Sequence, residues 1–394
     1  MKMIVTILMF AAALVSCGKQ DTVYKPFVKE GGYIYPAKPI ELKATSGYQR
    51  ILLEWDAPMD PSIRTTKLFW DNYSDSLVFS TSDYQDGSIQ VWVTDLDDRS
   101  YTFDVVNYDA AGNKSLATEI TTTPFGESWL LSHAERSFMR ATMDGDDAVV
   151  TMSKSTDEMV ATKFRYKMAD GTVTESEYLL PGNVEIRLPQ ALKGKRVEYK
   201  SAFLPVNGKD TVWSISWQKS MYPILYKPDT DGWTVEATKG QVGSSSTVTY
   251  SADKIFDGIL STSNRWHSSR TASTAKVFPK VLSIDTGVAE GGEFTFTDFF
   301  LYQHSTTPSL RYLREVLIFI GNAPFDPNDQ DPVNNFGTPA FKETIPQEAG
   351  YDAAIKPFVK GRYIALVFTN SRNSSGYVDL WELVPFGYLD TEMD

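Results

Sequence analysis

Few residues of this chain stand in a pattern that supports covalent catalysis. The 394 residues include one cysteine, Cys17, and three histidines. The Gly-x-Ser-x-Gly turn, the His-Glu-x-x-His helix, the phosphate loop and the Gly-x-Gly-x-x-Gly motif are all absent. A single cysteine also excludes an intrachain disulfide. A glycoside hydrolase stays open, because it needs only two carboxylates and 50 acidic residues give many accidental pairs.

The composition narrows the class of protein. The chain has 38 Lys and Arg against 50 Asp and Glu, a net charge of −12 at pH 7. This balance argues against general nucleic-acid binding, which needs a basic surface. Apolar residues make up 42% and charged residues 22%, which is typical of folded proteins. The length predicts about two to four domains, and the 13% of aromatic residues favours β-structure.

The first 17 residues predict export from the cytoplasm. Met3–Val15 is an apolar run, shorter than the ~20 residues of a membrane-spanning helix. It ends in Leu14-Val15-Ser16-Cys17, which resembles a bacterial lipobox. The resemblance implies cleavage before Cys17, lipidation of its sulfur and anchoring to the outer membrane, on its surface or periplasmic face. An ordinary signal peptide with a stray cysteine is the alternative, and residues 18–32 are expected to form a tether.

Two modules, at residues 33–124 and 125–223, show short alternating strands separated by turns. In the first, Ile51, Leu53 and Trp55 are expected to share one face. The run Leu96–Val105 resembles the corner of fibronectin type III domains, in which a tyrosine hydroxyl, here that of Tyr101, bonds back to the backbone. The second module repeats this order of leucine, turn and tyrosine at Leu192–Tyr199. We therefore expect two β-sandwiches of the fibronectin type III kind.

The two modules together also resemble the N-terminal region of an uncharacterised lipoprotein family of Bacteroidetes-type bacteria. The resemblance covers about residues 31–222 and includes the opening Tyr33-Ile34-Tyr35-Pro36-Ala37-Lys38. It implies a location in the cell envelope rather than a reaction, because sandwiches of this kind are commonly spacers.

Residues 224–390 resemble a discoidin, or coagulation-factor type C, domain. Four motifs occur in the family's order, and we expect Trp266 to lie in the core. The motifs are Lys254–Gly258 with Arg265–Ser268, Phe278–Gly287, Gly361–Leu366 and Leu380–Leu383. The resemblance implies an eight-stranded jelly-roll sandwich. The fold class expected for the whole chain is therefore all-β, with tandem sandwiches followed by a jelly roll.

Bacterial members of the discoidin family are mostly carbohydrate-binding modules, so the resemblance implies a glycan site in loops at one end of the jelly roll. Aromatic rings stack on the apolar face of a sugar, and Arg, His and Asn bond its hydroxyls. The candidates of these types in the matching loops are Arg265, His267, Gln303, His304, Arg311, Arg372, Asn373 and Tyr377.

Many discoidin domains hold a structural calcium ion, which takes carboxylate and carbonyl ligands. The resemblance places Asp257, Thr262 and Glu382 at the ligand positions. Ile259 stands where the family usually has Asp or Asn, a departure that weakens the site. No organic cofactor is expected.

The sequence thus predicts a lipid-anchored, non-catalytic protein that binds an oligo- or polysaccharide through its C-terminal module. The resemblance implies polysaccharide utilisation beside an outer-membrane transporter. The alternative is a protein–protein adhesion or assembly module, which would expose a flat apolar patch of several hundred Å². A hydrolase would instead show two facing carboxylates about 5–9.5 Å apart in a cleft.

Overall fold

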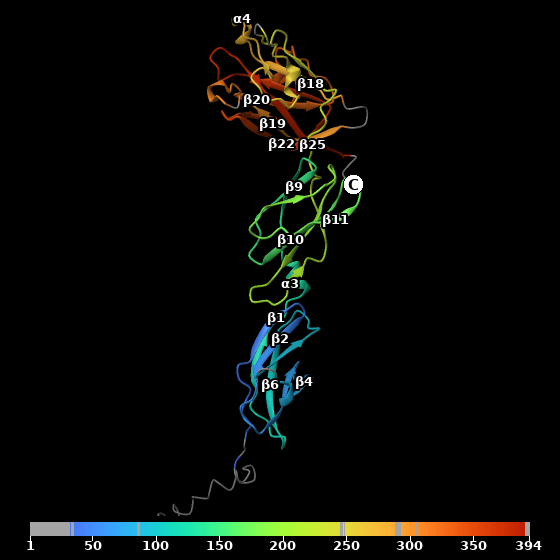
Figure 1. Cartoon of the computed structure of the whole chain (residues 1–394), viewed down its shortest axis with the longest axis vertical. Helices are drawn as coiled ribbons and strands as arrows, with labels where there is room; N and C mark the ends of the chain where they lie inside the picture. Colours follow the sequence, from blue (N-terminus) through green and yellow to red (C-terminus); the bar gives the residue numbers. More distant parts are fainter. Residues whose placement is uncertain are drawn as a thin grey trace, which may run out of the picture. The chain divides into compact units, whose positions relative to one another are not determined.

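The structure is a computed structural model that describes residues 32, 35–84, 87–244, 247, 249–287, 293–304 and 306–390. The predicted signal peptide, Cys17 and all of the predicted tether except Gly32 lie outside these residues. Strands dominate the described chain and the helices are short (Figure 1), so the all-β prediction is confirmed. No helix in the described ranges is long and apolar enough to cross a membrane.

The chain divides into two compact units. Unit 1 runs to His133 and also contains Leu204–Val212. Unit 2 contains Ala134–Phe203 and continues from Trp213. Unit 1 holds one β-sandwich and unit 2 holds two.

The sandwich of unit 1 has a sheet of order β1-β2-β5 and a sheet of order β4-β3-β6-β7. The strands are β1 (Lys43–Gly47), β2 (Arg50–Asp56), β3 (Ile63–Trp70), β4 (Asp75–Ser80), β5 (Ser88–Val93), β6 (Tyr101–Asp109) and β7 (Thr118–Thr122). Alternation in β2 directs Ile51, Leu53 and Trp55 into the core, as predicted. A helix, α3 (Glu127–Leu131), follows the last strand.

Hydrogen bonds of Tyr101 and Asp210 stabilise the structure of unit 1. The Tyr101 ring is buried, and its hydroxyl accepts a hydrogen bond from the Asp97 N–H at 3.0 Å. This bond confirms the predicted tyrosine corner. The segment 204–212 is tied to the first sandwich by Asp210, whose carboxylate accepts from Arg50 Nε and from the Tyr48 N–H, both at 2.9 Å.

The first sandwich of unit 2 has sheets of order β12-β9-β8 and β11-β10-β13-β14, with β15 also paired to β13. Its strands are β8 (Phe138–Asp144), β9 (Asp147–Met152), β10 (Met159–Lys167), β11 (Val173–Glu175), β12 (Glu185–Leu188), β13 (Glu198–Phe203), β14 (Val212–Trp213) and β15 (Gln218–Lys219). Tyr199, the expected counterpart of Tyr101, packs against Phe138 and Phe164 at ring-centroid distances of 6.3 and 6.2 Å. Aromatic packing and a contact of its hydroxyl with the Phe138 backbone position this tyrosine.

The C-terminal sandwich has a five-stranded sheet, β16-β18-β23-β20-β21, and a three-stranded sheet, β22-β19-β25. These strands are β16 (Thr234–Ala237), β18 (Lys280–Asp285), β19 (Phe294–Tyr302), β20 (Glu315–Gly321), β21 (Phe341–Thr344), β22 (Gly350–Gly361), β23 (Tyr363–Phe368) and β25 (Glu382–Leu389). A two-residue ladder joins β17 (Trp266–His267) to β24 (Asp379–Leu380). Trp266 is fully buried and stacks on Phe368 at 5.4 Å, which confirms its predicted core position.

Candidate functional site

Stretches that are far apart in the sequence meet at one end of the C-terminal sandwich. β17 and β24 pair so that His267 lies opposite Asp379. The N–H of Trp381 donates to the Tyr302 carbonyl at 2.9 Å, which brings the segment after β19 alongside. His304 then packs on Trp381 with ring centroids 4.7 Å apart. The structure thus joins residues that the sequence analysis placed in separate loops.

Asp379 is the buried carboxyl group of this end. Its side chain is 1% exposed, and its Oδ2 lies 3.3 Å from Arg265 Nε. Burial raises the pKa of Asp379 to about 7, while the charge of Arg265 opposes the shift. The guanidinium carbon of Arg265 also lies 4.9 Å from the Tyr250 ring centroid and 5.8 Å from that of Trp381. Burial therefore favours the protonated form of Asp379 well above the pH at which an exposed aspartate ionises.

His267 is held in one tautomer. Its Nδ1 lies 2.6 Å from the Ser268 carbonyl, so Nδ1 carries the proton and Nε2 a lone pair. Burial lowers the pKa of His267 to about 4, which keeps the imidazole neutral at pH 7. The rings of Tyr250, Tyr312 and Tyr377 surround it at centroid distances of 5.6, 6.3 and 5.5 Å.

His304 and Arg311, two further predicted residues, are bonded to each other. Arg311 Nε donates to the His304 carbonyl at 2.7 Å, and its Nη1 donates to the Gln347 carbonyl at 3.0 Å. The Thr307 N–H lies 3.3 Å from His304 Nδ1. Burial lowers the pKa of His304, and the nearby Arg265 adds to the shift.

Gln303, Arg372 and Asn373, three further predicted residues, hydrogen-bond to backbone groups of nearby loops. The Gln303 side chain is fully buried, donates to carbonyls of the 346–348 turn and accepts from the Leu313 N–H. Arg372 donates to the Leu313 carbonyl. Asn373 Oδ1 accepts a hydrogen bond from the Ser375 N–H at 2.8 Å, within the same turn. We assign Gln303 and Arg372 to loop support, because backbone groups already use their polar atoms, and Asn373 stays half-buried at the rim.

Three polar atoms of this end are buried and lack a hydrogen-bond partner among the described residues. They are Arg265 Nε, Asp379 Oδ1 and Trp381 Nε1. Arg265 and Asp379 attract each other as ions, but their contact lacks hydrogen-bond geometry. Buried polar groups in folded proteins are rarely left unpaired, so such a group needs an explanation. These groups are gathered in one place, and the Trp381 side chain lies near enough to Asp379 to oppose the rise in its pKa although the contact lacks hydrogen-bond geometry.

Sequence reasoning missed four members of this site, Tyr250, Tyr312, Asp379 and Trp381. In the run 379–382, two acidic residues flank Leu380 and Trp381, next to the predicted closing strand Leu380–Leu383. Acidic residues are almost never fully buried unless they are paired. That rule was the available signal, because it predicts a charged or polar partner for Asp379.

The predicted calcium ligands fit a cation only in part. Both Asp257 oxygens accept from Asn264 Nδ2, at 2.6 and 2.7 Å, and the Thr262 carbonyl accepts from Arg265. Glu382 is buried and has one oxygen without a partner, and burial raises its pKa to about 7. The described residues contain no group of three or more His, Cys, Asp or Glu able to hold a metal. The Asn264 amide occupies both oxygens of Asp257 in this arrangement, so a cation bound there would require this amide to turn away.

A cavity of about 750 Å³ lies between the two sandwiches of unit 2. Asp298 lines it and pairs with Arg140 Nη2 at 2.8 Å, while Arg140 Nη1 lies 3.8 Å from Asp352. Burial and the neighbouring Asp298 raise the pKa of Asp352. The single charge of Arg140 offsets only one of these two carboxylates, and its pairing with Asp298 assigns the three residues to the junction between the sandwiches.

Comparisons with known proteins give a family match over part of the chain. Residues 17–211 match the model of a family described as a domain of unknown function, DUF4998. No curated protein matches the sequence.

Solved structures with a similar fold include a SusE-like protein, with 10% identity, a TM-score of 0.34 and coverage of 89% of this chain and 97% of that one. The C-terminal domain of a chitobiase from Bacteroides fragilis has 14% identity, a TM-score of 0.31 and coverage of 41% and 98%. The family 32 carbohydrate-binding module of EndoD from Streptococcus pneumoniae has 10% identity, a TM-score of 0.28 and coverage of 39% and 94%. At these identities the likeness concerns the fold alone.

Proposed function

We propose that the C-terminal sandwich binds a glycan, without catalysis, at the Asp379 cluster. We define this cluster as Arg265, His267, His304, Asp379 and Trp381 with the flanking Tyr250, Tyr312 and Tyr377. The unpaired polar atoms of Arg265, Asp379 and Trp381 carry the proposal. Each such atom costs about 1–3 kcal/mol when it is left unpaired. A sugar can supply both missing donors and missing acceptors, since every hydroxyl is both.

The rim of the cluster supports the proposal. Tyr377 is half-exposed and packs beside His267, so its ring can receive the apolar face of a sugar. Arg311 and Asn373 are half-buried on neighbouring loops. A few polar groups beside an aromatic ring are the usual composition of a small-ligand site.

The setting we propose combines this site with the N-terminal features. Lipidation of Cys17 would hold the protein in the cell envelope, where the sandwich of unit 1 would act as a spacer. Tethering raises the effective concentration of a weak binding site. In this setting the protein captures polysaccharide, in the company of an outer-membrane transporter.

The first test uses the chain beginning at Asp21, which contains every described residue, on an array of polysaccharides and host glycans. The double variant His304→Ala/Arg311→Ala is compared with wild type. We expect wild type to bind at least one neutral glycan and the variant to lose that binding. Retained binding in the variant would place the site elsewhere. Failure of wild type on all glycans would overturn the function, and a search for protein partners would follow.

A further inference from the structure

Two tryptophans and a tyrosine lie at the surface of the first sandwich of unit 2. Trp213 is the last residue of β14, and Trp217 directly precedes β15. Tyr178 packs against Trp213 with ring centroids 5.4 Å apart. Tyr178 is 56% exposed, and both tryptophans are half-buried. Because aromatic side chains are highly buried on average, a group of them at the surface points to an interaction site. We name these three residues the aromatic patch.

Two lysines of the sheet beneath hold the tryptophans close together. Alternation along β10 points Lys163 outward, while Phe164 next to it is buried. Lys163 Nζ lies 5.0 Å from the centroid of the Trp213 ring and 5.4 Å from that of the Trp217 ring. Lys200 of β13 lies directly opposite Lys163, and its Nζ is 5.7 and 4.9 Å from the same two centroids. Because both ammonium groups project from the sheet, the ring surface that they cover faces the sheet and the exposed part faces away.

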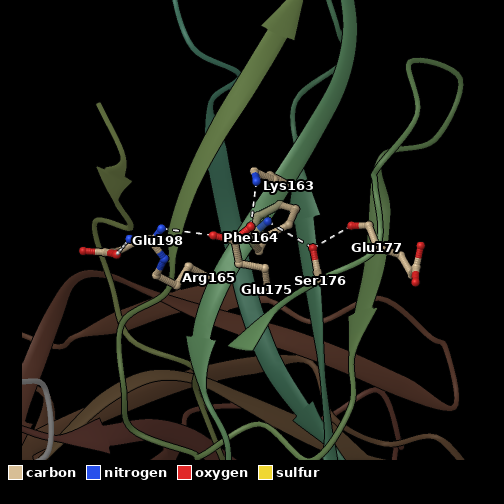
Figure 2. Close-up of polar contacts among 7 residues, drawn as sticks. All are labelled: Lys163, Phe164, Arg165, Glu175, Ser176, Glu177 and Glu198. Atoms are coloured by element: carbon tan, nitrogen blue, oxygen red, sulfur yellow. Dashed lines mark hydrogen bonds and ion pairs between the residues drawn. The ribbon is translucent and has the colours of Figure 1, made fainter. Parts of the chain in front are cut away.

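The cations next to the aromatic patch have carboxylate partners (Figure 2). Glu175 accepts from Lys163 Nζ at 2.6 Å and from Arg165 Nη2 at 3.0 Å. Glu198 lies 3.7 Å from Arg165 Nη1. The Arg165 guanidinium carbon is in turn 4.1 Å from the centroid of the Trp217 ring. This ion-pair network therefore fixes the cations on which the ring rests.

Lys200 also has acidic neighbours. Burial lowers its pKa and the charge of Lys163 adds to the shift, whereas Glu175 and Glu135 oppose it. Three carboxylates, those of Glu135, Glu175 and Glu198, thus accompany the three cations beside the tryptophans. A surface with balanced charge does not concentrate ions of either sign. It favours a neutral ligand over an ionic one.

A neutral sugar chain suits this combination of rings and paired charges. The C–H faces of a sugar stack on aromatic rings, and its hydroxyls bond ammonium groups and carboxylates in place of water. An apolar protein surface would instead remove water from the charged groups without replacing its hydrogen bonds, which is costly. The charges beside the rings therefore favour a glycan over an apolar protein partner.

We infer that the aromatic patch is a second binding site, for a neutral polysaccharide. Its three rings receive the apolar faces of the sugars, and Lys163, Lys200 and Glu175 bond the hydroxyls. The patch lies on a different sandwich from the Asp379 cluster, and the inference goes beyond the function proposed for that cluster.

The experiment measures binding of the chain from Asp21 to surfaces coated with amylopectin, galactomannan, xyloglucan or the acidic polygalacturonate. Every protein carries Tyr377→Ala, which weakens the Asp379 cluster, and the unaltered wild type is measured beside it. Trp217→Ala and Tyr178→Ala are then added one at a time, so that each removes one ring of the aromatic patch. Circular dichroism establishes that every variant is folded. Because Tyr178 is mostly exposed, its variant keeps the test decisive if Trp217→Ala does not fold.

Matched controls come from unit 1. Trp92→Ala removes a half-buried tryptophan whose ring centroid lies 4.0 Å from the Arg50 guanidinium carbon, much as Trp217 lies beside Arg165. Tyr73→Ala removes a tyrosine that is 56% exposed, as Tyr178 is.

We expect the Tyr377→Ala protein to bind at least one of the three neutral polysaccharides. Adding Trp217→Ala should weaken this binding at least tenfold and adding Tyr178→Ala at least threefold, while both controls stay within about twofold. Equal binding by the patch variants and their controls, or binding to polygalacturonate alone, would overturn the inference. Absence of binding by the Tyr377→Ala protein would also overturn it, and any binding by wild type would then belong to the Asp379 cluster.

Discussion

His267 and Asp379 face each other across the β17–β24 ladder, and burial shifts their pKa values in opposite directions. The imidazole has a pKa of about 4 and stays neutral at pH 7, and burial raises the pKa of the carboxyl group to about 7. Neighbouring residues thus offer a nitrogen lone pair and an oxygen acceptor. Such a pair suits hydroxyl ligands, which can donate to both atoms.

The first prediction concerns Asp379→Asn and the pH dependence of stability. Because the folded pKa of Asp379 is raised, the folded state holds a proton that the unfolded state releases between about pH 4 and pH 7. This group therefore removes stability as pH rises through that window. His267 acts in the opposite direction, since its lowered pKa removes stability as pH falls from about 6.5 to about 4. The amide variant should lose the carboxyl contribution and keep that of His267.

The carboxyl contribution is measured by denaturant unfolding of wild type and Asp379→Asn at several pH values between 5 and 8. The free energy of unfolding of the variant should gain roughly 1–3 kcal/mol relative to wild type as pH rises from about 5 to about 8. Asp231→Asn, an exposed loop residue, is the matched control and should follow wild type. Parallel pH profiles for wild type and Asp379→Asn would contradict the burial of a shifted carboxyl group.

The second prediction concerns the junction of the two sandwiches in unit 2. Arg140→Ala leaves the Asp298 carboxylate, whose side chain is 5% exposed, without its 2.8 Å partner. We expect a loss of about 2–4 kcal/mol in the free energy of unfolding, because a buried charge is left uncompensated. The double variant Arg140→Ala/Asp298→Asn should recover part of this loss. A loss below about 0.5 kcal/mol in denaturant titrations would show that the pair contributes little.

The third prediction concerns calcium. Since the Asn264 amide binds both oxygens of Asp257, calcium should stabilise the wild-type protein little. Thermal unfolding in EDTA and in excess calcium should give midpoints within about 1 °C of each other. Asn264→Ala should lower the midpoint in EDTA, because Asp257 loses its donor. A rise of several degrees in wild type with calcium would show that Asp257 and Glu382 bind the ion and that the amide turns away.

Local sequence patterns predicted much of the fold. Alternation in β2 predicted the buried face of Ile51, Leu53 and Trp55, and the spacing before Tyr101 predicted its corner bond. The grouping of segment 204–212 with unit 1 could not be predicted, because it depends on Asp210 meeting Arg50 across 160 residues. Patterns within a short stretch of sequence do not indicate contacts between residues so far apart.

The site could be predicted only in part, because several of its contacts also join residues that are far apart in the sequence. Arg265, His267, His304, Arg311 and Tyr377 lie at one end of the C-terminal sandwich, in the loops that the resemblance drawn from the sequence implied. The support role of Gln303 could not be predicted, since its partners lie in the 346–348 turn and at Leu313. The position of Asp379 depends on pairing with a residue more than 100 positions earlier.

The most direct test of the central claim is calorimetric titration of a neutral oligosaccharide, chosen from the array, into wild type, Tyr377→Ala and Tyr363→Ala. Tyr363 is also half-exposed, but it is the first residue of β23. Tyr377 lies in the loop that follows the last residue of β23, at the other end of this strand. The account predicts that Tyr377→Ala weakens binding at least about tenfold while Tyr363→Ala stays within about twofold of wild type. Equal affinities for the two variants would contradict a glycan site at the Asp379 cluster.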